Sequence, residues 1–384
     1  MKRISILLMA AAFAVPACSS DSSTGDDMPG DDTPGPTDEW DRELAKREYD
    51  YNAALRIASL RLTGDLPSMT EINQVASAPD LPAKKVAYEA LVTDMMNRPT
   101  FARQMFFFWR DTFKMGETAE MDFAPAFAAQ VSVQNMDYRS LMTATTGTCP
   151  TVDIAAGTFT AGNCAANGPV AGVITDKGAM RQYDGNFAFR RVKWIQETFD
   201  CLKFPVEMGG TPQDVGAASQ YVGNWPFTSI AGTANGGRVN FLDVSAVICA
   251  NCHQTMNHIA PLFAYYDEMG VYQPAIAVAT PLDGAPMARL TDYLPAGEAT
   301  AWRHNVPAAD LPGLGAAMAA DEDVAKCGVA RMWNWAMGKQ DIVDTLNEVP
   351  VETIRAQLDS FIASGYKVKD LIFAVYTADD FVKF

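Results

Sequence analysis

The stretch PAKKVAYEALVTDMMN, residues 82–97, decides which fold class we predict for this chain of 384 residues. Its larger apolar side chains recur at the spacing of one helical face: Val86, Leu91, Val92 and Met95. Pro99 follows closely, and proline helps to end a helix because it cannot continue the hydrogen-bond ladder. The stretch therefore predicts an amphipathic helix with one buried face.

Three further segments carry the same helical signal. Residues 101–113 are aromatic nearly all round, so we expect this helix to be buried. Two later segments place apolar side chains at helical spacing before a glycine: Val329, Met332, Trp333, Ala336 and Met337 before Gly338, and Ile354, Leu358, Phe361 and Ile362 before Gly365. No strand-rich domain stands out in the sequence. We therefore predict an all-α, mainly helical fold.

Residues 249–253 read Cys-Ala-Asn-Cys-His, and this motif carries the chemistry of the chain. Two thiols three positions apart on one helical turn can each add to a vinyl group of haem. The adjacent His253 then brings its imidazole under the iron as the proximal ligand. We therefore predict one covalent haem c, attached through Cys249 and Cys252.

Three other interpretations of Cys249 and Cys252 remain open. A redox-active pair normally follows a strand in a βαβ unit, and residues 242–248 are ambiguous between strand and helix. A zinc site needs four ligands and usually a second Cys/His pair, whereas the other thiols are isolated. A disulfide between the two cysteines would close a strained small loop. Haem attachment also agrees with export, because it takes place outside the bacterial inner membrane.

The sixth ligand of the haem iron stays open between several groups. Met287 lies in a loop at a distance downstream that suits the distal side, and His304 is the alternative. Another methionine or an open position completes the set. A thioether raises the reduction potential relative to a second imidazole, and an open position invites ligand or peroxide chemistry. His258, five residues after His253, is expected to be a packing or surface residue.

The N-terminus has the pattern of an export signal. A basic start precedes an apolar run over residues 4–17, which is too short to span a membrane. Cys18 follows and resembles the lipobox cysteine of bacterial lipoproteins, which is acylated and becomes the new N-terminus. We therefore predict a lipoprotein signal peptide at residues 1–18, with plain secretion or a buried helix as alternatives. Ser19 favours, by the same resemblance, an outer-membrane lipoprotein of the cell envelope that faces the periplasm or the cell surface.

Residues 19–37 consist of Ser, Asp, Gly, Pro and Thr, broken only by Met28. Such a segment cannot bury enough apolar surface to order itself, so we predict a disordered acidic tether. The whole chain has 30 Lys and Arg against 46 Asp and Glu, a formal net charge of −16. Because an acidic chain repels phosphate backbones, we expect no nucleic-acid partner. We expect contact with the membrane through the lipid anchor only.

Seven cysteines occur in the chain, and the export signal places them in an oxidising compartment. Cys18 and the two cysteines of the motif are already assigned, which leaves four thiols and three possible pairings. Cys149 and Cys164 bracket a stretch rich in Gly, Thr and Ala and form the natural local pair. Cys201 would then join Cys327 in a long-range disulfide.

The sequence after the haem motif carries the first part of a family resemblance. The motif is followed by an apolar helix and then by Asp-x-x-Gly, here Asp267 to Gly270. The proteins that this chain resembles, which are named below, usually have Asp-Pro after the haem histidine, where this chain has Asn257 and His258.

Other blocks extend the resemblance. Residues 327–338 are similar to a helix of cysteine and aromatic residues that closes with Leu-Gly-Arg, with Lys339 in place of the arginine. Residues 365–381 look like the terminal segment of the family, and residues 60–71 resemble a helical module that often accompanies it. Together these blocks resemble the cytochrome c domain surface lipoproteins of the planctomycete and myxobacterial type, a family of largely unassigned function. The resemblance implies no catalytic residues.

These features predict five parts of the chain: the signal peptide at 1–18, the tether at 19–37, an N-terminal helical module at 38–117, a loop-rich Gly/Thr/Ala-rich insertion with room for a hairpin at 118–186, and a cytochrome c-like haem domain with C-terminal helices at 187–384.

The leading hypothesis is an outer-membrane-anchored c-type cytochrome that transfers single electrons to or from a redox partner protein. The acidic composition favours a partner with a basic docking patch. Alternatives are a haem-dependent oxidoreductase or peroxidase-like enzyme, and a surface protein in which the haem is structural. The chain has only three His, and no Ser-His-Asp set is evident. The sequence therefore favours electron transfer over catalysis.

Overall fold

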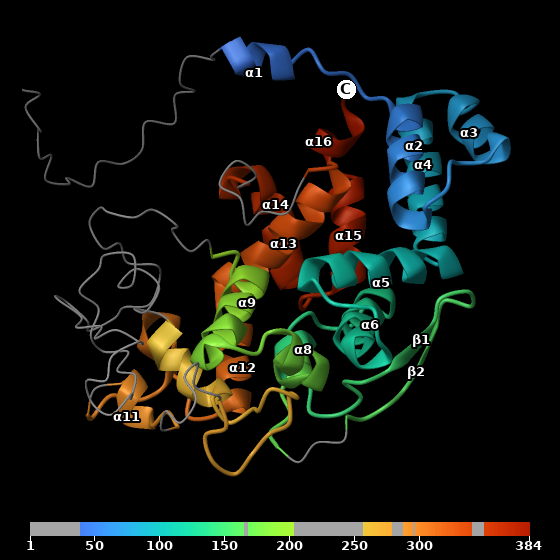
Figure 1. The fold of residues 1–384 in the computed structure, drawn as a ribbon. Coiled ribbons are helices and arrows are strands. Elements are labelled where there is room, and N and C mark those ends of the chain that lie inside the picture. Colours follow the sequence, from blue (N-terminus) through green and yellow to red (C-terminus); the bar gives the residue numbers. More distant parts are fainter. Residues whose placement is uncertain (1–38, 165–167, 203–255, 279–286, 295, 340–348) are drawn as a thin grey trace, which may run out of the picture. The chain divides into compact units, whose positions relative to one another are not determined.

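The structure, a computed structural model, describes residues 39–164, 168–202, 256–278, 287–294, 296–339 and 349–384 (Figure 1). The predicted signal peptide and tether lie outside these residues, and so does the haem motif. Contacts divide the chain into two units, residues 1–47 and residues 48–384. The first unit contributes one described helix, α1 (Glu39–Leu44).

The second unit is built mainly of helices, which confirms the predicted fold class. In the described residues, strands are confined to two antiparallel two-stranded sheets, β1 (Thr151–Asp153) with β2 (Thr158–Thr160) and β3 (Ala301–Trp302) with β4 (Val306–Pro307). None of the helices described is long and apolar enough to cross a membrane.

Three of the first four helices of this unit begin at a side-chain cap, and the fourth begins at a proline. They are α2 (Tyr51–Thr63), α3 (Met69–Ala76), α4 (Leu81–Met95) and α5 (Pro99–Phe113). Asp50 and Asp80 accept backbone N–H bonds at the starts of α2 and α4. Ser68 and Glu71 form a reciprocal capping box at the start of α3. Local sequence therefore fixes where these helices begin.

Helix α4 occupies the segment predicted at 82–97, but its buried face differs from the prediction. Leu91, Val92 and Met95 are buried, and the fourth member of the face is Tyr88. Val86 is 67% exposed, so its assignment to the buried stripe is wrong. Residues 88, 91, 92 and 95 lie on one face of the helix. Val86 precedes Tyr88 by two positions, which is a rotation of roughly 200°, so its side chain lies on the opposite face.

Helix α5 packs against α6 (Ala119–Val133), which lies beyond the predicted boundary at residue 117. The indole N–H of Trp109 donates to the hydroxyl of Ser132 at 2.9 Å and joins the two helices. Most aromatic side chains of α5 are buried, as expected, but Phe107 is 40% exposed. Helix α6 shows that the 118–186 region is not loop-rich from its start.

The remainder of that region is irregular with short elements: α7 (Ser140–Thr143), the hairpin β1–β2, the 3₁₀ turn η1 (Gly172–Thr175) and α8 (Lys177–Gln182). The hairpin lies between Cys149 and Cys164, inside the stretch for which the sequence left room for one.

The rest of the described chain is again helical. Its elements are η2 (Asn186–Ala188), α9 (Phe189–Phe199), a helix described over residues 256–263, α11 (Leu290–Tyr293), η4 (Arg303–Asn305), α12 (Leu311–Ala320), α13 (Glu322–Ala336), α14 (Val351–Ala363), α15 (Val368–Tyr376) and α16 (Asp379–Val382). The orange and red helices α13, α14 and α15 pack on one another (Figure 1). The buried Tyr88 hydroxyl donates to the carbonyl of Tyr376 at 2.6 Å and ties α4 to α15.

Candidate functional site

The predicted haem attachment residues Cys249, Cys252 and His253 lie outside the described residues, as does the predicted lipidation residue Cys18. The structure does describe the chain on both sides of residues 203–255. Before this segment, the described residues end at 202, three positions after α9. After it, they begin again with the helix over residues 256–263. The surroundings of these two ends are the part of the candidate site that can be built from contacts.

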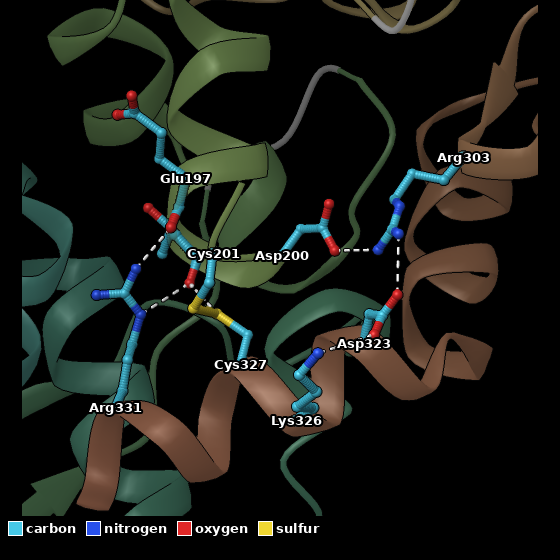
Figure 2. The surroundings of a disulfide bond; sticks show 9 residues. Glu197, Asp200, Cys201, Arg303, Asp323, Lys326, Cys327 and Arg331 are labelled. Carbon is cyan, nitrogen blue, oxygen red and sulfur yellow. Dashed lines mark hydrogen bonds and ion pairs between the residues drawn. A yellow bond between two sulfur atoms is a disulfide. The ribbon is translucent and has the colours of Figure 1, made fainter. Parts of the chain in front are cut away.

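A disulfide holds the chain just before residue 203. Cys201 follows α9 and is bonded to Cys327 on α13, with a Cα–Cα distance of 5.4 Å (Figure 2). Cys149 is bonded to Cys164 in the same way. Both are the pairings predicted from the sequence. The long-range bond fixes residue 201 on a helix whose Cys327 is only 3% exposed.

Arg331 strengthens this junction one turn further along α13. Its Nη2 donates to the carbonyl of Glu197 at 2.6 Å, and its Nε donates to the carbonyl of Thr198 at 3.1 Å (Figure 2). These carbonyls belong to the last turn of α9, where carbonyl groups lack partners within the helix. A buried arginine therefore caps the helix that leads to the disulfide.

Asp200, the residue before Cys201, joins a second group of charges. Arg303 lies between Asp200 and Asp323, with Nη2 of Arg303 2.9 Å from Oδ2 of Asp323 (Figure 2). Burial raises the pKa of Asp200 to about 7, although the neighbouring guanidinium of Arg303 opposes this rise. The pairs hold η4, which contains His304, beside the end of α9.

Arg191 on α9 holds the chain on the other side of the motif. The side chain is fully buried. It donates hydrogen bonds of 2.8–3.1 Å to the carbonyls of Met180, Phe263, Tyr266 and Asp267 and to Oδ1 of Asp184. Three of these carbonyls belong to the end of the helix over 256–263 and the turn after it. One guanidinium therefore fixes this helix end against α8 and α9.

The Asp-x-x-Gly sequence after that helix forms a tight turn. Oδ1 of Asp267 accepts from the backbone N–H of Met269 at 3.0 Å and of Val271 at 2.9 Å. Gly270 has φ +69°, and a Cβ there would lie 2.3 Å from the carbonyl oxygen of Lys177. Asp267 thus accepts the hydrogen bonds of the turn, and Gly270 allows its backbone to lie close to the carbonyl of Lys177. These two roles explain why the turn has aspartate and glycine at these positions.

The other candidate ligands are placed as follows. His258 is 5% exposed and its Nε2 lies 3.0 Å from Oε2 of Glu298, which fits the packing role expected for it. Met287 is 46% exposed. His304 lies in η4. Residues 249–253 lie outside the described residues, so the structure does not test which of these side chains lies near His253.

Sequence reasoning missed a buried carboxyl group, that of Asp176. It is 2% exposed and lines a cavity of about 450 Å³ together with Lys177, Tyr266 and Tyr272. Its Oδ1 accepts from the N–H of Ala179 at 3.0 Å and caps α8. Burial raises its pKa to about 7. A cap of this kind can be predicted from sequence, but its burial depends on distant segments.

Asp176 also lies close to the Cys149–Cys164 disulfide. The two sulfur atoms and a carboxylate oxygen of Asp176 lie within 4.8 Å of one another, which is close enough for three ligands of one metal ion. Thiolates are the ligands that such a site needs, and here both sulfurs are used in the bond between them. The cluster is therefore a disulfide beside a buried carboxyl group, and it offers no thiolate while oxidised.

Comparison with known proteins gives no match to this chain among family models, curated proteins or solved structures. Its function must be argued from its own residues.

Proposed function

We propose that this chain is an envelope lipoprotein that carries one covalent haem c and transfers single electrons to or from a redox partner protein. The observation that carries the proposal is the Cys-Ala-Asn-Cys-His sequence at residues 249–253, and the N-terminal residues have the pattern of an export signal. Cys249 and Cys252 would hold the porphyrin, and His253 would hold the iron. The family resemblance described above agrees with this proposal.

The haem would supply one-electron chemistry when bound, and the chain would tune it. His253 would hold the iron through its imidazole, and Met287 or His304 would supply a further ligand, with another methionine or an open position as alternatives. A thioether favours the reduced iron more than an imidazole does, so this choice sets the reduction potential.

Contacts near both ends of residues 203–255 support the proposal. The Cys201–Cys327 bond precedes this segment, and Arg191 fixes the end of the helix that follows it. A cofactor attached within this segment would be bound to chain that is held near both of its ends. Such anchoring limits the reorganisation that accompanies a change of charge.

The two disulfides support an oxidising compartment, which is also where haem c is attached. We propose that a lipid on Cys18 anchors the protein in the outer membrane, with residues 19–37 as the tether. A variant with Cys18→Ala should be found in the soluble rather than the membrane fraction after cell lysis. Equal membrane association of both forms would contradict the lipid anchor.

The optical spectrum of the mature protein, produced together with a haem c attachment system, tests the central proposal. We expect a haem c spectrum that survives acid–acetone extraction. The pair Cys249→Ala/Cys252→Ala should lose it, whereas the pair Cys149→Ala/Cys164→Ala removes a disulfide elsewhere and should keep it. Absence of covalent haem from the unaltered protein would overturn the proposal.

Spectra of single variants identify the sixth ligand. If Met287 binds iron, Met287→Ala should abolish the methionine-to-iron charge-transfer band and lower the reduction potential. If His304 binds it, that band should be absent from the unaltered protein and His304→Ala should open the iron to cyanide. Rapid binding of carbon monoxide by the unaltered protein would instead support the haem-enzyme alternative.

A further inference from the structure

The two cysteines of the Cys149–Cys164 disulfide differ in their access to solvent. Cys164 is half-buried and lines the cavity of about 450 Å³ whose wall also contains Tyr266 and Tyr272. The hydroxyl oxygen of Thr148 lies 3.7 Å from Sγ of Cys164 and can donate to a thiolate there. Cys149 is only 6% exposed. A thiol that enters the cavity therefore reaches Cys164 more readily than Cys149.

The buried carboxyl group of Asp176 lies beside the less accessible sulfur. Its Oδ2 lies 3.8 Å from Sγ of Cys149, while its Oδ1 accepts from the N–H of Ala179 at 3.0 Å. Burial raises the pKa of Asp176 to about 7, so the carboxyl group still holds a proton in part of the molecules near neutral pH. Because Oδ1 is already an acceptor, that proton resides on Oδ2 and faces the sulfur of Cys149.

The other titratable groups around Asp176 leave it without a counter-ion. Glu120 on α6 interacts with Asp176 and adds to the rise of its pKa. The nearby cations of α8 bind Glu120 instead, with Nζ of Lys177 at 3.0 Å and Nη1 of Arg181 at 3.6 Å. Burial raises the pKa of Tyr266, so its hydroxyl stays un-ionised near neutral pH. Among the residues that the structure describes, Asp176 therefore forms no ion pair.

We propose that Cys149–Cys164 is a redox-active disulfide that exchanges with a cysteine pair of a partner protein. Cys164 is the sulfur that the partner attacks, and Asp176 donates a proton to Cys149. The cavity lies within the range of about 300–1,000 Å³ that is typical of ligand pockets, which leaves room for a cysteine in an extended segment of the partner. The site is separate from the proposed haem and is present with or without it.

The exchange proceeds in two steps. A thiolate of the partner attacks Sγ of Cys164, the disulfide bond breaks, and its electron pair leaves on Sγ of Cys149, which takes the proton from Oδ2 of Asp176. The second thiolate of the partner then attacks the partner's own sulfur in the mixed disulfide and releases Cys164 as a thiolate. The partner becomes a disulfide and loses two protons to solvent, while Cys164 and Asp176 each take one from solvent. The same steps in reverse re-form Cys149–Cys164 from a partner disulfide.

Reduction of the folded protein by glutathione, followed by alkylation and peptide mass spectrometry, tests which sulfur reacts. The second disulfide, Cys201–Cys327, is the control within the same molecule, because Cys327 is 3% exposed. We expect Cys149–Cys164 to open at least about tenfold faster than this control. The trapped intermediate should carry glutathione on Cys164 and a free thiol on Cys149. Equal rates for the two disulfides, or glutathione on Cys149, would overturn the proposal.

The pH dependence of this rate tests the role of Asp176. The rate constant is divided by the ionised fraction of glutathione, which removes the titration of the attacking thiol. As pH rises from about 5.5 to about 8.5, the corrected rate should fall by about tenfold, because Asp176 loses the proton that Cys149 takes and its charge then opposes the thiolate. Asp176→Asn keeps a capping oxygen but has no carboxyl proton, so its corrected rate should not change with pH.

Asp80→Asn is the matched control for loss of a charged helix cap. Asp80 accepts from the N–H of Ala83 at 2.8 Å at the start of α4, as Asp176 does from Ala179 at the start of α8. This variant should behave as the unaltered protein does. The same pH dependence in Asp176→Asn as in the unaltered protein would overturn the proposal, and so would its loss in Asp80→Asn as well. Each result is read from the peptides that contain residues 149, 164, 201 and 327, so none depends on haem.

Discussion

Arg191 illustrates at the scale of one residue how the described structure is held together. Its guanidinium bonds to four carbonyl oxygens and one carboxylate, with no exposure to solvent. Replacing it by methionine leaves these buried acceptors without their donor. We expect Arg191→Met to lower the free energy of unfolding by about 3 kcal/mol or more, as for other buried charge networks broken on one side.

The neighbour of Arg191 supplies the control for urea unfolding measurements. Arg190 is exposed and makes one side-chain bond, to the carbonyl of Asp184. Arg190→Met should change stability by about 0.5 kcal/mol or less. Similar losses for the two variants would show that burial of the Arg191 network is not what stabilises this region.

Asp176 predicts a dependence of stability on pH. Its pKa is raised from 3.8 to about 7 in the folded chain, because burial disfavours the ionised form. Between these values the folded state holds a proton that the unfolded state has lost, so stability falls as pH rises from about 4 to about 7. Asp176→Asn keeps a capping oxygen and removes the titration. Between pH 4 and pH 8, the free energy of unfolding of the variant should rise relative to that of the unaltered protein by at most about 4 kcal/mol.

A difference in stability between Asp176→Asn and the unaltered protein that stays constant from pH 4 to pH 8 would contradict the raised pKa of Asp176.

Single residues differ in how far the sequence could predict them. The pairing of the four cysteines followed from their number and spacing, and it required no knowledge of packing. Val86 was misplaced because an apolar residue at near-helical spacing need not belong to the buried face. The burial of Asp176 depends on segments around Tyr266, 90 positions away in the chain, and no local pattern reports it.

At the scale of elements, the two disulfides should differ in their effect on stability. Cys201–Cys327 closes a loop of 126 residues and Cys149–Cys164 closes one of 15. Since a longer loop loses more entropy from the unfolded chain, removal should cost about 5 kcal/mol for the first and about 3 kcal/mol for the second. Thermal or urea unfolding of the two double Cys→Ala variants measures this order. A larger loss for the short loop would contradict it.

Helices with regular apolar spacing and clear ends were predictable. The segments of α4, α13 and α14 had both, and Gly338 and Gly365, each with positive φ, lie two residues after the last residue of α13 and of α14. Helix α6 was missed because Pro125 lies inside it and its many alanines give a weak contrast between faces. Packing against α5 stabilises α6, although the local sequence of α6 does not predict a helix.

At the scale of the whole molecule, the net charge of −16 predicts the salt dependence of the proposed electron transfer. A partner with a basic surface should react more slowly as ionic strength rises, by about tenfold between about 10 mM and about 300 mM salt. Stopped-flow measurement of haem oxidation gives this rate. An uncharged small reductant is the control and should be almost insensitive to salt. A flat response with the basic partner would remove the electrostatic part of the proposal.

The candidate site divides into a part visible in sequence and a part that is not. The haem motif is contiguous, so five residues suffice to propose it. The junction around the Cys201–Cys327 disulfide combines α9 and α13, which are far apart in the chain and are brought together only by folding. The same is true of the Arg191 network, whose acceptors span residues 180–267.

The beginning and end of the second unit lie against each other. Glu48 and Phe384 exchange two backbone hydrogen bonds of 3.0 Å each, and Tyr49 pairs with Lys383. Joining residue 384 to residue 48 by a short Gly/Ser linker would therefore add little strain. New termini fit in the exposed turn at residues 154–156, and the Cys149–Cys164 bond would still link the two cut strands. Such a circular permutant should keep the helical circular dichroism spectrum. That result would show that the packing of the helices does not depend on the order in which the chain connects them.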